Sequence, residues 1–130
     1  MIIDSSAILA IVFDEPEAVR MANAIAAASS RRMSAVNWLE TLMVAEGRHG
    51  PESADDALLI LREFEVEALA FDRDQMIEAR SAWKRFGKGR HAAALNLGDC
   101  CAYAAALTTN DELLYKGGDF LKTDIATASW

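Results

Sequence analysis

The sequence has few of the residues that build covalent or soft-metal frameworks. Its 130 residues contain 2 cysteines, 2 prolines and 2 histidines. The cysteines are adjacent, at Cys100 and Cys101, and adjacent thiols suit neither a disulfide framework nor a zinc site. We therefore expect two reduced, buried thiols on a helix. Because no cluster of His and Cys is present, any metal site is expected to use oxygen ligands.

Long apolar runs and positive charge are also scarce. The longest apolar run, residues 100–107, is far shorter than the roughly 20 residues of a membrane span. No basic segment precedes an apolar one as in a secretory signal, so we expect a cytoplasmic protein. The 13 Lys and Arg against 20 Asp and Glu give a net charge of −7. This balance argues against non-specific nucleic-acid binding and favours a cationic partner. A nucleic-acid substrate would require the acids to be gathered in one pocket and masked by metal.

What is present points to one α/β domain spanning residues 1–130. The composition, 52% hydrophobic and 25% charged, is ordinary for a globular protein. Apolar and helical patterns alternate along the chain. They predict strands at residues 2–3, 32–36, 65–71, 112–116 and 124–129. They predict helices over residues 7–13, 16–28, 38–48, 53–64, 73–86 and 98–108, with Asn37 capping the third and Asp72 the fifth. Strands that alternate with helices predict a three-layer α/β/α fold with a central, mostly parallel sheet.

The first seven residues are the stretch around which the chain is organised. Ile2 and Ile3 suit a buried strand, Asp4 ends it, and an apolar helical run follows. Open α/β sheets bind ligands at the carboxyl ends of their strands, which makes Asp4 a candidate site residue. The alternative is that Asp4 only caps the helix that follows.

Three further acids have ordinary explanations when each is taken alone. Glu40 lies on a mostly apolar helix stripe, where it needs a cation or partner unless its side chain extends to water. Asp99 in a first helical turn interacts favourably with the helix dipole, and Asp119 follows a Gly-Gly turn. Together with Asp4, these acids can converge on one edge of a parallel sheet. Carboxylates ~5 Å apart repel by about 3 kcal/mol per pair at an effective dielectric of ~20. A hard divalent cation, Mg²⁺ or Mn²⁺, relieves that repulsion.

Five short segments stand in a characteristic order: IDSSA (3–7), LE (39–40), GDC (98–100), LLYKGGDF (113–120) and TDIA (123–126). In order and spacing they resemble the PIN-domain ribonucleases, specifically the VapC-type toxins of toxin–antitoxin systems, over the whole chain. The resemblance implies a PIN-like domain. It also implies a metal-dependent endoribonuclease that hydrolyses phosphodiester bonds in RNA, with tRNA or another translation-related RNA as substrate. It further implies inhibition by a VapB-type antitoxin and a homodimer.

The resemblance also assigns residues. The catalytic and Mg²⁺- or Mn²⁺-binding acids that it implies are Asp4, Glu40, Asp99 and Asp119, with Ser6 as a hydroxyl that supports Asp4.

One of the five segments departs from the family. Tyr115 stands where many relatives have Thr, and Gly117 stands where they have a further Asp. Asp124 is therefore a candidate to replace the missing acid.

A short basic stretch is the candidate for contact with RNA. Four of the thirteen Lys and Arg, together with His91, lie within eight residues. The predicted phosphate-binding residues are Lys84, Arg85, Lys88 and Arg90, with Lys116 as an addition. The alternative is a solvated helix end whose cations complement the dipole. His91, in a glycine-flanked loop, is a poor candidate for a general base.

Other functional classes fit the sequence less well. A haloacid-dehalogenase-like phosphatase needs a second Asp where Ser6 stands, and a response-regulator receiver needs paired acids after its first strand. A serine hydrolase needs a general base, and none lies near Ser5 or Ser6 in the sequence. The remaining rival is a PIN-like module that binds RNA or protein without catalysis. The four acids favour the enzyme.

Overall fold

Four short parallel strands form the central sheet in the computed structural model, which describes residues 1–130. The strands are β1 (Ile2–Ile3), β2 (Arg32–Ser34), β3 (Glu67–Leu69) and β4 (Leu113–Leu114). Their order is β3-β2-β1-β4, and every neighbouring pair is parallel. The predicted three-layer α/β/α fold with a parallel sheet is confirmed.

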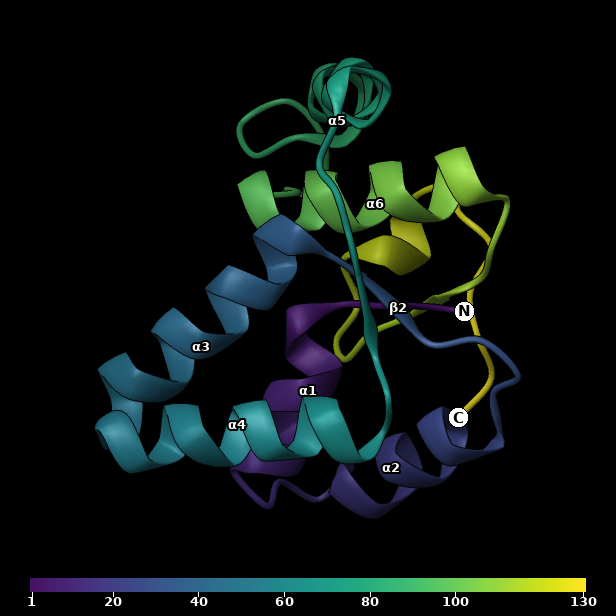
Figure 1. Cartoon of the computed structure of the whole chain (residues 1–130). Coiled ribbons are helices and arrows are strands. Elements are labelled where there is room, and N and C mark those ends of the chain that lie inside the picture. Colours follow the sequence, from purple (N-terminus) through teal and green to yellow (C-terminus); the bar gives the residue numbers. More distant parts are fainter.

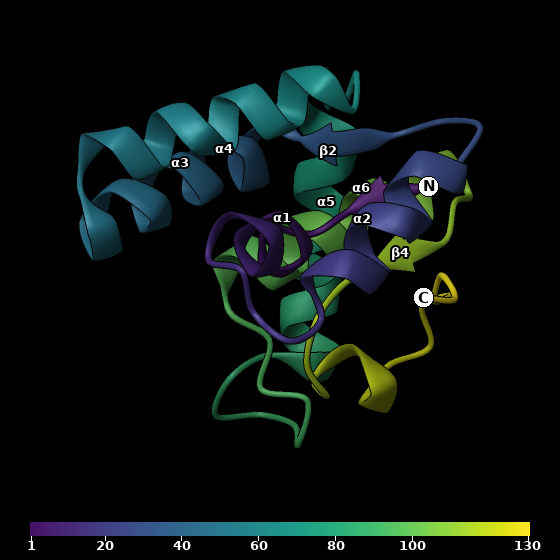
Figure 2. The same ribbon diagram turned by 90° about the horizontal axis from the view of Figure 1, so that it is seen from below.

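Six α-helices cover the two faces of the sheet. They are α1 (Ser5–Val12), α2 (Ala18–Ala27), α3 (Ala35–His49), α4 (Pro51–Glu63), α5 (Arg73–Phe86) and α6 (Leu97–Thr109). In Figure 1, α5 and α6 lie above the sheet, whereas α1, α2 and α4 lie below it. Helices α3 and α4 pack against each other and extend together to one side, as Figure 2 also shows.

The two faces of the sheet bury two separate apolar clusters. Successive residues of a strand point to opposite faces, so the pairs in β1 and β4 divide between the clusters. Ile2 and Leu113 pack with residues of α5 and α6. Ile3 and Leu114 pack with residues of α1, α2 and α4. The central strands β1 and β4 are therefore apolar at both positions, because each contributes one side chain to each cluster.

The order of the strands creates a switch point between β1 and β4. The chain builds β2 and β3 on one side of β1 and returns to place β4 on the other. In such sheets the loops that follow the two central strands diverge and leave a crevice at their carboxyl ends. Asp4 follows β1 at this edge, and the Asp4 N–H donates to the Leu114 carbonyl at 2.9 Å.

Two expected elements differ from the structure. No strand forms over residues 124–129. Thr127 makes an isolated bridge to Leu113, and a 3₁₀ helix, η1 (Phe120–Lys122), precedes this segment. Asn37 does not cap the third helix, because α3 already begins at Ala35, where the Ser34 hydroxyl accepts the Val36 N–H. Ser is as good a cap as Asn, which leaves Asn37 inside the helix.

Two other expectations, the cap of α5 and the buried thiols, are confirmed. Asp72 caps α5 by accepting the Gln75 N–H. Both cysteines are free and buried. No helix is long and apolar enough to cross a membrane.

Candidate active site

Asp4 combines both roles that the sequence allowed. It caps α1, because its Oδ2 accepts the Ser6 N–H at 2.9 Å, and it also accepts the Ser6 hydroxyl at 2.5 Å. The Ser6 Oγ in turn accepts the Lys116 N–H at 2.9 Å. Ser6 therefore links the loop after β4 to the acid that follows β1.

The Asp4 carboxyl is buried without a cationic partner. Asp4 is 5% exposed, and no Lys, Arg or His forms an ion pair with its carboxyl. Burial raises the pKa of Asp4 to about 6, the charges of Asp99 and Glu40 add to the rise, and the Ser6 hydrogen bonds oppose it. A positive ion at this position would stabilise the ionised form.

Glu40 points into the same cluster from α3. Its Oε2 accepts the Ser5 hydroxyl at 2.6 Å, and the Asn37 amide nitrogen lies 3.3 Å from the same oxygen. The carboxylate also rests against Gly98 at the start of α6, where any Cβ would overlap it. Glu40 is thus half-buried, and its carboxylate is held among Ser5, Asn37 and Gly98.

Asp99 is part of a capping box at the start of α6. The Asp99 N–H donates to the Asn96 side chain at 2.9 Å, and the Asn96 N–H donates to the Asp99 carboxylate at 2.8 Å. Burial raises the pKa of Asp99, and the charges of Glu40 and Asp119 raise it further. The helix-end role is therefore real, yet the same carboxylate lies within the field of two other acids.

The segment after β4 places Asp119 at the edge of this cluster. Asp119 is exposed and precedes η1 without a capping side-chain bond. Tyr115, at the position where the resemblance led us to expect Thr, is buried and packs its ring on Phe120 with centroids 4.8 Å apart. The position therefore serves packing in this chain.

Asp124 is engaged elsewhere. Its Oδ1 accepts the Tyr103 hydroxyl at 2.7 Å, and its Oδ2 pairs with Arg85 at 2.5 Å. These two hydrogen bonds lower the pKa of Asp124. Because both oxygens are occupied, a role as a metal ligand would require this ion pair to break.

The predicted RNA-binding residues fall into two groups. Arg85 is paired with Asp124, and Lys116 is paired with Glu15 at 2.6 Å and Glu17 at 3.0 Å. Lys84, Lys88 and Arg90 form no ion pair, and the Arg90 guanidinium lies 3.9 Å from the Trp83 ring centroid. The second group is thus the one whose charge is available to a phosphate.

Three residues at the site were not predicted from the sequence. One is Gly98, and another is Ser5, whose hydroxyl donates to Glu40. The third is Asn37, which is fully buried and whose Nδ2 lies 3.3 Å from Asp4 Oδ1 and 3.0 Å from the Gly98 carbonyl. The available signal for Asn37 was its spacing, because a residue three positions before Glu40 shares its helix face.

The donor atoms at the site fit a hard cation, although they are not gathered into a finished coordination shell. No three Asp, Glu, His or Cys side chains are placed so as to hold a metal ion in this arrangement. The donors are nevertheless carboxylate oxygens, and burial raises the pKa of both Asp4 and Asp99. Such a set fits Mg²⁺ or Mn²⁺ better than a softer metal.

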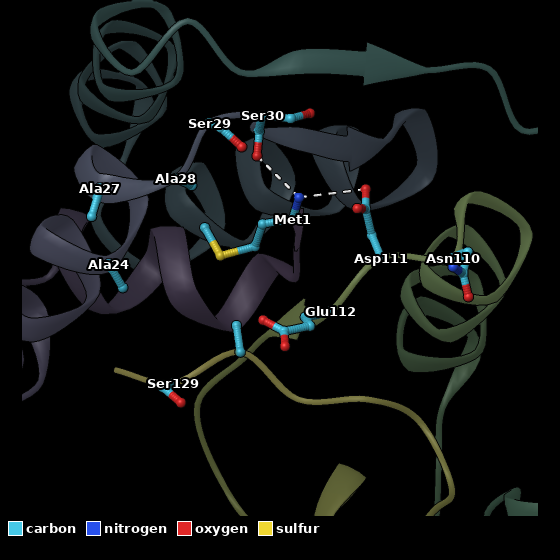
Figure 3. Close-up of a pocket in the computed structure, with 11 residues that line it drawn as sticks. Met1, Ala24, Ala27, Ala28, Ser29, Ser30, Asn110, Asp111, Glu112 and Ser129 are labelled. Carbon is cyan, nitrogen blue, oxygen red and sulfur yellow. Dashed lines mark hydrogen bonds and ion pairs between the residues drawn. The ribbon is translucent and has the colours of Figure 1, made fainter.

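Two hollows of the surface differ in their relation to these acids. An apolar groove of about 430 Å³, walled by Leu39, Met43 and Leu97, borders Glu40 and Gly98. A cavity of about 450 Å³ lies at the amino ends of the strands, where the Met1 ammonium donates to the Ser30 carbonyl at 3.0 Å and pairs with Asp111 at 3.4 Å (Figure 3). Because only the groove borders one of these acids, the groove and not the cavity is the candidate substrate site.

Comparison with known proteins gives relatives over nearly the whole chain. A protein-family model described as "PIN domain" matches residues 1–126. Ribonuclease VapC30 of Mycobacterium tuberculosis is 43% identical over 129 residues, which cover 99% of this chain and 98% of the relative. Ribonuclease VapC of Mycolicibacterium smegmatis is 44% identical over 126 residues, covering 97% of this chain and 98% of the relative.

Solved structures share the fold at low identity. The crystal structure of VapC20 from Mycobacterium tuberculosis has a TM-score of 0.78 at 16% identity and covers 96% of this chain and 95% of its own. A toxin–antitoxin complex from Klebsiella pneumoniae has a TM-score of 0.69 at 17% identity, covering 95% of this chain and 92% of its own. VapBC2 of Rickettsia felis, bound to promoter DNA, has a TM-score of 0.74 at 12% identity and covers 99% of this chain and 97% of its own.

Proposed function

The chain belongs to the PIN-domain family and, within it, to the VapC-type toxins, and from this membership we propose its activity. The proposed activity is metal-dependent endoribonucleolytic hydrolysis of phosphodiester bonds in RNA. The observation that carries it is that Asp4, Glu40 and Asp99, from three different elements, lie close to one another at the carboxyl edge of the sheet. The Asn37 amide nitrogen lies 3.3 Å from a carboxylate oxygen of both Asp4 and Glu40, and the Glu40 carboxylate rests against Gly98, next to Asp99. We also propose that residues 1–130 form one domain.

Asp4, Glu40, Asp99 and Asp119 are the residues that would hold Mg²⁺ or Mn²⁺, whose chemistry here is to acidify a water and neutralise charge on the phosphate. The Ser6 hydroxyl donates a hydrogen bond to Asp4, and the Ser5 hydroxyl donates one to Glu40. These bonds fix the orientation of both carboxylates before substrate arrives, which reduces the reorganisation that the reaction requires. Because each hydroxyl donates to a carboxylate, no side-chain nucleophile is part of the proposal.

The unpaired cations of the basic stretch are proposed to guide RNA to the acids. Lys84, Lys88 and Arg90 lie at the end of α5 and in the loop after it. Lys88 and Asn96 line one apolar pocket, and Asn96 caps the helix that carries Asp99. Phosphate contacts from these side chains would position RNA without reading its sequence.

The substrate and partners are proposed from the relatives. The VapC20 structure is described as that of a sarcin–ricin loop cleaving toxin, and the other two structures contain a toxin with an antitoxin or VapB chain. For this chain we propose tRNA or another translation-related RNA as substrate, a VapB-type antitoxin as inhibitor, a homodimer and a cytoplasmic location.

The test of the enzymatic proposal is cleavage of RNA by the purified protein. Cleavage is expected with Mg²⁺ or Mn²⁺, and EDTA should stop it. Asp4→Asn, purified in parallel, should be inactive, which excludes a contaminating nuclease. RNA binding by the wild type without metal-dependent cleavage would instead support the rival function, a PIN-like binding module.

A cationic antitoxin segment is proposed to inhibit by entering the acidic pocket. The net charge of −7 and the carboxylates without cationic partners favour such a segment. An Arg among Asp4, Glu40 and Asp99 would neutralise them by charge-assisted bonds. The check is an antitoxin whose C-terminal half has lost its basic residues, which should no longer inhibit. Full inhibition by that variant would contradict this mode of inhibition.

A further inference from the structure

We propose that Asn37 is a positioning residue of the carboxylate site, one neutral amide that fixes Asp4 and Glu40 relative to the start of α6. The inference rests on the proposed function, since it concerns how that site is held in shape. It adds to the four acids a neutral residue that orients two of them, Asp4 and Glu40.

The contacts of Asn37 join three elements at one nitrogen atom. Its Nδ2 lies 3.3 Å from Asp4 Oδ1 after β1 and 3.3 Å from Glu40 Oε2 on α3. It lies 3.0 Å from the carbonyl of Gly98, the residue before Asp99 on α6. The Ser5 Oγ is a fourth neighbour at 3.3 Å. An amide nitrogen has two protons, which are therefore shared among these four acceptor oxygens. The four oxygens belong to the three segments that carry Asp4, Glu40 and Asp99.

The burial of Asn37 shows which end of its amide is used. The residue has no exposed surface, and its Oδ1 is buried without a hydrogen-bond partner. An unsatisfied buried acceptor is unfavourable, and an apolar side chain would fill the same space without that penalty. Reversing the amide would direct Oδ1 toward four oxygens, so the NH₂ group is the functional end.

A neutral donor suits a site that has to receive a cation. A Lys or Arg between Asp4 and Glu40 would form ion pairs and occupy the position that the metal needs. The amide instead offers only partial positive charge, which orients both carboxylates while their full charge remains available. Asn37 thereby reduces the movement that the acids need in order to bind a metal.

The test compares Asn37→Ala with Thr41→Val as a matched control. Thr41 is also fully buried on α3, but its hydroxyl donates only to the Asn37 backbone carbonyl, at 2.8 Å. Thermal unfolding is followed while Mn²⁺ alone is added, and RNA cleavage is measured separately. For Asn37→Ala, the Mn²⁺ concentration that gives half of the stabilisation should rise by about 10–100-fold, and cleavage should fall by a similar factor. For Thr41→Val, both should match the wild type, although its melting temperature without metal falls.

The outcomes separate this inference from the proposed function. An unchanged Mn²⁺ dependence in Asn37→Ala, or an equal change in Thr41→Val, would overturn the positioning role while leaving the metal site intact. If Asn37→Ala does not fold, Asn37→Ser replaces it, and a wild-type Mn²⁺ dependence in that variant has the same meaning, because a serine hydroxyl does not reach all three elements. A wild type that does not respond to Mn²⁺ would overturn the metal site, and the role of Asn37 with it.

Discussion

At the residue scale, the site depends on a missing side chain as much as on those present. Gly98 leaves the space in which the Glu40 carboxylate lies, and a Cβ there would overlap that carboxylate. The overlapping atoms are the far end of a flexible side chain and not backbone. A larger residue would therefore displace Glu40 without forcing the helices apart.

Gly98→Ala is accordingly expected to separate activity from stability. Cleavage should fall at least tenfold because Glu40 leaves its place, whereas the melting temperature should change by only a few degrees, since Ala favours a helix over Gly by up to ~1 kcal/mol. Gly47→Ala on α3, which has open space around it, is the control and should gain stability with full activity. The measurements are thermal unfolding and RNA cleavage. Full activity in Gly98→Ala would show that the position of Glu40 is unimportant.

The buried Asp4 carboxyl should make the metal-free protein less stable as pH rises. Its pKa is raised from 3.8 in the unfolded chain to about 6 in the folded one. The folded state therefore binds the proton more tightly. The stability from this group is fully present below pH 3.8 and is lost as the pH rises to 6, a change of about 3 kcal/mol.

Asp4→Asn isolates this effect, because Asn does not titrate. In EDTA, the melting temperature of the wild type should fall relative to that of Asp4→Asn between pH 4 and 6, by roughly 10 °C. Parallel curves for the two proteins would mean that Asp4 is not held as a buried, unpaired acid.

The proximity of Asp4, Glu40 and Asp99 could be predicted from the sequence, whereas the residues that support these acids could not. Asp4 is recognisable because it ends an apolar strand, and Asp99 because it begins a helix. Gly98 and Asn37 acquire their meaning only where α3 and α6 touch, and no local pattern encodes that contact. Asp124 resembled a spare acid in the sequence, but its partner Arg85 lies 39 residues away.

At the scale of elements, the start of α6 serves two purposes. The Asp99 carboxylate closes a capping box with Asn96, and its pKa is raised by burial and further by the charges of Glu40 and Asp119. The box stabilises the helix, whereas the repulsion disfavours the charged carboxylate.

Asp99→Asn should expose this conflict. The amide keeps an oxygen that can accept the Asn96 N–H, so the metal-free variant should melt at or above the wild-type temperature. With metal at ten times its dissociation constant, the wild type should gain about RT ln 11, or ~1.4 kcal/mol, roughly 3–6 °C. The variant should gain little and should not cleave RNA. A metal-free variant that melts well below the wild type would mark Asp99 as a structural cap only.

The loop after α5 should carry the salt dependence of RNA binding. Lys88→Ala with Arg90→Ala should weaken binding to all RNAs, because phosphate contacts carry no sequence information. The slope of the logarithm of the RNA-binding constant against the logarithm of the salt concentration should flatten by roughly 0.7 per lost phosphate contact. Arg62→Ala, an exposed Arg on α4 without an ion pair, is the control. An unchanged slope in the double variant would make the loop a solvated helix end.

Element prediction succeeded where the signals were local. The Asp72 cap of α5 can be predicted from the sequence because Asp is a preferred residue immediately before a helix. The predicted start of α3 is three residues too late, because both Ser34 and Asn37 are good N-cap residues. The position at which β2 ends determines which of the two caps the helix. The expected last strand is reduced to one bridge at Thr127 because pairing there depends on the neighbouring β4, which is only two residues long.

At the scale of the whole molecule, the fold follows from a simple alternation. The two central strands, β1 and β4, are apolar and buried at both positions, so they require helices on both faces of the sheet. The chain supplies α1, α2 and α4 on one face and α5 and α6 on the other (Figure 1). The return of the chain to place β4 beside β1 creates the crevice at which the acids meet. The architecture could therefore be predicted from the sequence, whereas the exact partners at the crevice could not.

The central claim is that carboxylates at this crevice support hydrolysis of RNA by water. The most direct measurement is the chemistry of the ends that the purified protein leaves on a defined RNA, with Mg²⁺ or Mn²⁺ and with EDTA. A water nucleophile should give 5′-phosphate and 3′-hydroxyl ends, produced only with metal and not by Asp99→Asn. Products that end in 2′,3′-cyclic phosphate, or cleavage that continues in EDTA, would contradict the account, because the RNA 2′-hydroxyl would then be the nucleophile or the metal would be dispensable.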